Sequence, residues 1–196
     1  AIMIPAKSPY QKLSELIDAA KAKPGELTIA STGNGTIGHL SGELLQRAAG
    51  VKMTHVPYKG AAVAFPDLIS GRITVFHSSV ETAMPQVNAG TIRVLAVTSA
   101  HRVPVLKNVP TVAEFGIKGV EASTWFGYLA PAKTSKDIVT KLSAEVSRAI
   151  SKPEVRERLA SAGEQITPGP EAFTAVLKAD LGKWGKVIRE TGLKQE

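Results

Sequence analysis

Several features that would assign this chain to a special class of protein are missing. Its 196 residues include no cysteine, which excludes a disulfide framework, a cysteine metal site and a cysteine nucleophile. No apolar run approaches the roughly 20 residues that a transmembrane helix needs. Aromatic residues make up 5% of the chain, and no basic run with interleaved aromatic residues is present. We therefore expect neither a membrane-spanning segment nor a nucleic-acid partner.

Common enzyme motifs are missing as well. The chain has no G-x-S-x-G nucleophile elbow and no H-E-x-x-H motif, and its four histidines, at positions 39, 55, 77 and 101, show no metal-ligand spacing. The run His77-Ser78-Ser79 could pair a base with a nucleophile only through unusual local geometry. We expect a protein that is not an enzyme and that has no metal site and no cofactor.

The composition of the chain is typical of a globular protein. Hydrophobic residues make up 43% of it, and its length suits one large domain or two small ones. The formal net charge is +7, but the 24 Lys and Arg are scattered among 17 acidic residues. This pattern indicates solvated helix faces and a mild field that attracts small anions.

A glycine-rich turn follows a short apolar strand in the stretch LTIASTGNGTIGHL, from Leu27 to Leu40. Glycine permits backbone angles that other residues avoid, and Thr36 suits the N-cap of a following helix. Such a loop directs free N–H groups toward one point, where the helix dipole also favours an anion. We expect ligand binding by Ser31, Thr32, Gly33, Asn34, Gly35 and Thr36.

The same glycines fit G-x-G-x-x-G, the fingerprint of dinucleotide binding. That interpretation needs an acidic residue about 20 positions further on, to hold a ribose hydroxyl. No acidic residue lies between Glu43 and Asp67, although Lys59 could meet a 2′-phosphate. An NAD(P)-binding oxidoreductase fragment therefore stays as an alternative, and so does a glycine-rich turn that binds nothing.

Strands and helices alternate through the first half of the chain, which predicts βαβ crossovers and an α/β fold with a mainly parallel sheet covered on both faces. The expected elements are a helix from the Ser8 N-cap to Pro24, a strand near 27–30, a helix from Thr36 to Gly50, a strand at 52–56, a helix at 61–70, a strand at 73–76, a helix ending near 89 and a strand at 92–97. Ligands of such sheets bind at the carboxyl ends of the strands. We expect His77 and Ser78, after one strand, to contact the far end of the ligand.

The second half of the chain does not continue the alternation of strands and helices. A capping box at Thr111 and Glu114 predicts one helical turn, and the aromatic run 121–131 predicts a strand. Helices are expected at 136–150, 152–161 and 171–190, the last with an apolar stripe from Phe173 to Ile188.

Six segments in this order resemble the receptors of tripartite tricarboxylate transporters, also called Bug receptors: KPGELTIASTGNGTIGHLSGELL, HVPYKGAA, LAVTSAHR, VPTVAEFG, STWFGYLAP and KPEVRERLA. The resemblance covers essentially the whole chain. It implies a periplasmic-binding-protein-like fold of two α/β lobes around a cleft. It also implies a periplasmic location and a role in carrying carboxylates or related small molecules to a membrane permease.

The chain departs from the family pattern in two ways. The family's first hundred or so residues, most of its first lobe, are absent, so we expect residues 1–124 to be the second lobe and residues 125–196 the returning C-terminal part of an incomplete first lobe. His77 also stands where the family commonly has Asp, so the family's contacts there are not carried over. We expect a receptor that captures a small organic acid for the permease. A ligand-sensing receptor for a signalling partner is an alternative.

Overall fold

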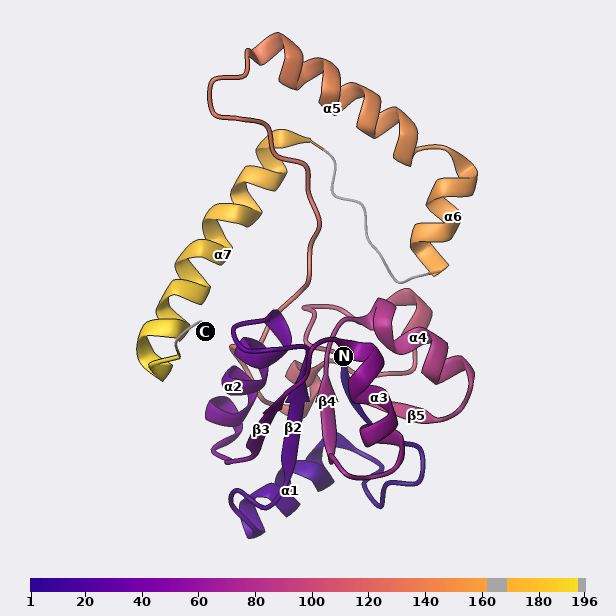
Figure 1. The fold of residues 1–196 in the computed structure, drawn as a ribbon, viewed down its shortest axis with the longest axis vertical. Coiled ribbons are helices and arrows are strands. Elements are labelled where there is room, and N and C mark those ends of the chain that lie inside the picture. Colours follow the sequence, from indigo (N-terminus) through magenta and orange to yellow (C-terminus); the bar gives the residue numbers. More distant parts are fainter. Residues whose placement is uncertain (162–168, 194–196) are drawn as a thin grey trace.

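The computed structural model of the chain describes residues 1–161 and 169–193. A five-stranded sheet in the order β3-β2-β4-β1-β5 forms the centre of the body at the bottom of Figure 1. The strands are β1 (Ile2–Pro5), β2 (Thr28–Ser31), β3 (Thr54–Pro57), β4 (Val75–His77) and β5 (Ile92–Ala96).

The sheet is mixed because β1 runs against its neighbours. Strand β2 pairs in parallel with β3 and β4, whereas β1 lies between β4 and β5 and is antiparallel to both. Four strands therefore point one way and one strand opposes them, which agrees with the predicted mainly parallel α/β sheet. Strand β1 was not expected, because its four residues are a short run that ends in a proline.

Helices cover both faces of the sheet, as predicted. Helices α1 (Leu13–Ala22) and α2 (Ile37–Ala49) pack on the face that carries Ile4 and Val75. Helices α3 (Ala61–Ile69) and α4 (Val80–Asn88) pack on the other face, which carries Phe76. Neighbouring residues of one strand enter opposite cores because side chains alternate across a strand.

The start of helix α1 differs from the prediction. Its N-cap is Lys12 rather than Ser8, and no side chain caps the helix. The Ser8 hydroxyl accepts a hydrogen bond from the Tyr10 amide, and the Gln11 amide donates to the Glu15 carboxylate at 2.6 Å. The predicted capping residue therefore stabilises a turn that precedes the helix.

Two 3₁₀ helices, η1 (Pro104–Leu106) and η2 (Val112–Phe115), follow β5, and the predicted capping box of Thr111 and Glu114 is confirmed at the start of η2. Residues 117–135 form neither helix nor strand, so the strand expected at 121–131 is wrong. The Ala122 amide donates to the Thr98 carbonyl at 2.9 Å, but beyond it the segment extends away from the sheet in Figure 1, where no neighbouring strand lies beside it. Its aromatic side chains remain exposed, with Tyr128 86% accessible.

The remainder of the chain is helical, as expected: α5 (Lys136–Ile150), α6 (Pro153–Ser161) and α7 (Pro170–Thr191). In Figure 1, α5 and α6 stand away from the sheet, whereas α7 reaches down toward α2. Arg47 of α2 pairs with Glu190 of α7 at 3.2 Å. The Trp125 indole donates a hydrogen bond to Asp180 at 2.7 Å, which ties the extended segment to α7. No described helix combines the length and the apolar character needed to cross a bilayer.

Two glycines of α2 allow the helix to lie close to the sheet. A Cβ atom at Gly38 would come within 3.0 Å of the His77 carbonyl oxygen, which is closer than real Cβ atoms approach. At Gly42, one turn later, a Cβ atom would lie 3.1 Å from the Ile29 side chain. The N-terminus of α2 is therefore seated directly on the end of β4.

Because of this close packing, we expect two glycine-to-alanine substitutions within helices to change the free energy of unfolding in opposite directions. Gly38→Ala should lower the free energy of unfolding by about 1–3 kcal/mol, because the helix must move off a backbone carbonyl. Gly182→Ala, in α7, meets no atom within 4 Å and should raise it by about 0.5–1 kcal/mol through helix propensity. Urea unfolding of both variants measures the difference, and equal stabilities would contradict the close approach.

Candidate functional site

The carboxyl ends of three parallel strands meet at one edge of the sheet. Ser31, the last residue of β2, is in register with Pro57, the last residue of β3. His77 ends the adjacent strand β4, and both Ser31 and His77 lie next to Gly38 of α2. The structure thus brings the predicted loop, from Ser31 to Thr36, and the predicted His77-Ser78 pair to the same edge.

The loop from Ser31 to Thr36 uses both of its glycines for turns. Gly33 has a φ of 139° and Gly35 a φ of 71°, values that residues with a Cβ atom rarely adopt. Thr36 occupies the N-cap position of α2, as predicted, but its side chain does not cap the helix. Its hydroxyl instead donates to the Gly33 carbonyl at 2.8 Å, which folds the loop back on itself.

Two amides of this loop have partners within the protein. The Gly33 amide donates to the Ser31 hydroxyl and the Gly35 amide donates to Nδ1 of His39, each at 3.2 Å. An anion held by these amides would have to replace those acceptors. The replacement is physically reasonable because hydrogen bonds from an amide to an ionised group are stronger than those to a neutral group.

Two histidines that the sequence did not mark as site residues support the loop. The rings of His39 and His55 are stacked, with centroids 3.7 Å apart and planes inclined by 6°. Nε2 of His55 lies 2.8 Å from the Ser31 hydroxyl. Burial and the neighbouring His39 lower the pKa of His55 to about 4, and burial lowers the pKa of His39 while Glu43 acts in the opposite direction. Both rings are therefore neutral at pH 7.

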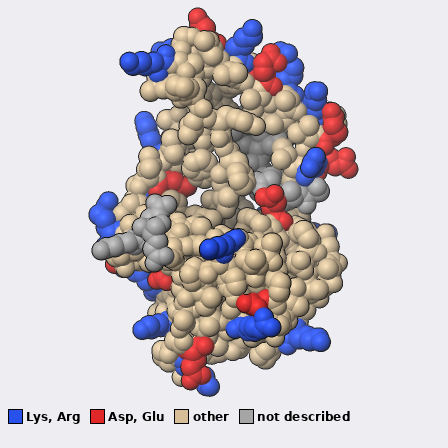
Figure 2. Space-filling model, in the orientation of Figure 1, with Lys and Arg blue, Asp and Glu red and all other residues tan. Residues whose placement is uncertain are grey.

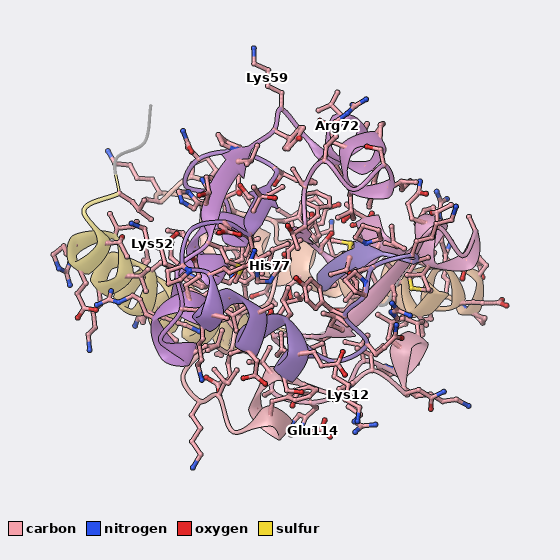
Figure 3. All side chains as sticks on the ribbon, turned by 90° about the horizontal axis from the view of Figure 1, so that it is seen from below. Lys12, Lys52, Lys59, Arg72, His77 and Glu114 are labelled. Carbon is pink, nitrogen blue, oxygen red and sulfur yellow. The ribbon has the colours of Figure 1, made fainter. Side chains whose placement is uncertain are left out.

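The predicted site residues after β4 are more enclosed. His77 is only 2% exposed and lies in the interior in Figure 3, with both ring nitrogens 3.4 Å from the Ser41 hydroxyl. Burial lowers its pKa well below the usual value. The Ser78 hydroxyl accepts a hydrogen bond from Thr82 at 3.1 Å. Contact between a ligand and the His77 ring would require the ring to leave this position.

Figure 2 shows Lys and Arg distributed around the visible face rather than gathered into a patch. Lys59, the candidate for a 2′-phosphate contact, projects outward in Figure 3, whereas Tyr58 next to it donates to Asp67 at 2.7 Å. Across residues 1–161 and 169–193, no three His, Cys, Asp or Glu side chains gather closely enough to hold a metal ion.

Residues 1–193 match the family described as "Tripartite tricarboxylate transporter family receptor". The chain is 39% identical over 191 residues to the "UPF0065 protein in tcbD-tcbE intergenic region" of a Pseudomonas species, matching 96% of this chain and 57% of that relative. It is 31% identical over 189 residues to BugT of Bordetella pertussis, matching 96% of this chain and 58% of BugT.

Two solved structures extend the comparison. R. palustris Rpa4515 with adipate superposes with a TM-score of 0.87 at 34% identity, covering 98% of this chain and 64% of that one. MatC (Rpa3494) from Rhodopseudomonas palustris with bound malate gives a TM-score of 0.84 at 28% identity, covering 95% of this chain and 65% of MatC. This chain therefore spans less than two thirds of the length of these relatives. The matched family is one of receptors, in agreement with the prediction that the protein is not an enzyme.

The buried histidine of β4 predicts a pH dependence of stability. His77 has a lowered pKa in the folded state, so below about pH 6.5 the unfolded chain binds a proton there that the folded chain does not. Stability is therefore retained above pH 6.5 and falls as the pH drops toward the folded pKa. His77→Leu removes this proton linkage, and the Ser41 hydroxyl keeps its bond to the Ile37 carbonyl at 2.6 Å.

Urea unfolding midpoints between pH 7.5 and 4.5 test this expectation. The wild type should lose stability more steeply than His77→Leu as the pH falls below 6.5. Identical slopes in the two proteins would mean that His77 titrates normally in the folded state and is not enclosed as described.

Proposed function

Because the chain belongs to the family of tripartite tricarboxylate transporter receptors, we propose that it binds a small organic anion, a carboxylate, and delivers it to a membrane permease. The proposed location is the periplasm, where such a receptor would meet its ligand. The observation that supports this proposal most is the loop from Ser31 to Thr36, which lies at the N-terminus of α2 and at the meeting point of three parallel strand ends. The relatives with adipate and malate indicate dicarboxylates as the ligands to test first.

The proposed binding step is an exchange of hydrogen bonds in the loop. A carboxylate would take the amide of Gly33 from the Ser31 hydroxyl and the amide of Gly35 from His39. The hydroxyls of Ser31, Thr32 and Thr36, together with the Asn34 amide, would complete the set of donors. The partial positive charge at the N-terminus of α2 adds to the attraction, so a neutral ligand of the same shape would bind more weakly.

Residues His77 and Ser78 are proposed to close the site from the end of β4. The His77 carbonyl supports the N-terminus of α2 at Gly38, and its ring lies beneath the same helix. Ser78 is 9% exposed and carries the nearest hydroxyl after the strand. In this proposal, His77 fixes the height of the helix above the sheet, and Ser78 limits the length of the ligand.

We also propose that residues 1–124 form one lobe and that residues 125–196 belong to the opposite lobe of a two-lobed receptor. The C-terminal part supports this division because it exposes many large apolar side chains, which an additional layer of protein would bury. The exposed side chains of this part are Trp125, Phe126, Tyr128, Leu129, Ile138, Leu142, Val176, Leu181 and Ile188.

A substitution at Gly35 tests the loop. Gly35→Val should weaken the binding of adipate, malate or whichever dicarboxylate binds best by at least about tenfold, because valine strongly disfavours a φ of 71°. Isothermal titration calorimetry on the full-length protein measures the effect. The matched control is Gly50→Val, which places the same strain, at a φ of 64°, at the opposite end of α2.

The control separates binding from stability. Both variants should be destabilised by about 1–2 kcal/mol, but only Gly35→Val should lose affinity. Equal affinities in the two variants would restrict the loop to a structural role. A screen in which no organic acid stabilises the wild-type protein would contradict the proposed function itself.

A further inference from the structure

The segment from Ser31 to Gly35 is tied down at both ends by the stacked histidines. Nε2 of His55 lies 2.8 Å from the Ser31 hydroxyl, and Nδ1 of His39 accepts a hydrogen bond from the Gly35 amide at 3.2 Å. We propose that His39 and His55 are a positioning pair, which holds this segment in the conformation that receives the anion. The inference rests on the proposed function only in taking the segment as the ligand loop.

The pair links three parts of the fold that are separate in sequence. His39 lies in the first turn of α2 and is 7% exposed, whereas His55 lies on β3, an edge strand of the sheet. His55 is in register with Ile29 of β2, so its side chain lies on the face of the sheet that α2 covers. The stacked rings therefore connect the edge strand to the helix directly beneath the loop.

The hydrogen bond to Gly35 requires a neutral His39. An amide N–H can donate only to a ring nitrogen that carries no proton, so Nδ1 is the acceptor and Nε2 carries the hydrogen. A second proton on this ring would place two donors against each other. The Gly35 amide would then lose its partner.

The contact between His55 and Ser31 does not have this requirement. The Ser31 hydroxyl can donate to Nε2, since the Gly33 carbonyl already accepts from the Thr36 hydroxyl at 2.8 Å. It can equally accept from a protonated Nε2 and donate to the Gly33 carbonyl, which lies 3.0 Å away. Of the two histidines, His39 is therefore the one whose protonation releases the loop.

The groups that act on the pair are its own two rings and Glu43. Burial and the stacked neighbour oppose a charge on His55, while burial opposes and Glu43 favours a charge on His39. As the pH falls, His39 is the first of the two to take a proton, and its charge further disfavours protonation of His55. The loop should therefore be held at neutral pH and released under acid conditions.

Amide hydrogen exchange of Gly35, followed by NMR in the full-length protein without ligand, tests the pair. In the wild type, the protection factor of this amide should be high at pH 7 and should fall at least about tenfold as His39 protonates, below pH 6.5. His39→Asn keeps an acceptor oxygen near the position of Nδ1 but cannot titrate, so its protection should not change over that range. His39→Leu removes the acceptor, so the Gly35 amide of this variant should be unprotected at every pH. His101→Asn, at an exposed position, is the matched control and should behave as the wild type.

Two results would overturn the proposal: protection of Gly35 in His39→Leu equal to that in the wild type, or a pH dependence in His39→Asn as steep as in the wild type. Titration with adipate at pH 7 separates this inference from the proposed function. A wild-type protein that protects Gly35 as expected but binds no dicarboxylate would support the positioning pair and contradict the proposed function.

Discussion

The close approach of α2 to the end of β4 determines the geometry of the whole site. Gly38 lies against the His77 carbonyl, and Gly42, one turn later, lies against the side chain of Ile29. Because these two glycines have no side chain, this side of the helix can lie directly against the sheet. Because the helix starts so close to the strand ends, the connection from β2 is short and must turn sharply, and this demands the positive φ angles of Gly33 and Gly35. The conformation of the loop is thus a consequence of helix packing.

This constraint explains why the glycine pattern also resembled a dinucleotide fingerprint. Both arrangements need a tight turn after a strand and a glycine where the helix crosses the sheet. The alternation of strands and helices could be predicted because it depends on local periodicity. Strand β1 and the unpaired segment 121–131 could not, since a strand is defined by its hydrogen-bonded neighbour. The apolar residues of β1 have such a neighbour on each side. The aromatic segment pairs with no strand in the part of the chain that the structure describes, and the hydrogen bond from the Ala122 amide to the Thr98 carbonyl is not continued into a ladder.

The candidate site, like the fold, could be predicted from the sequence only in part. The rule that parallel strands end at one edge of the sheet was enough to bring Ser31 and His77 together. It could not show that the ring of His77 is buried, because this follows from the central position of β4 and from the helix above it. The stack of His39 on His55 depends on the register between β2 and β3, which the sequence does not reveal. The strand ends were thus identified from sequence, but the side chains that support the loop were not.

A loop that satisfies its own amides also has a consequence for selectivity in the proposed receptor. If the amides of Gly33 and Gly35 had no partners, any hydrogen-bond acceptor would gain by binding them. Here a ligand must displace the Ser31 hydroxyl and the His39 ring, which are neutral acceptors of ordinary strength. A neutral ligand only exchanges one such bond for another, whereas a carboxylate gains from its charge and from the helix dipole. The internal hydrogen bonds of the empty loop therefore favour anions, because a neutral ligand gains little free energy by replacing them.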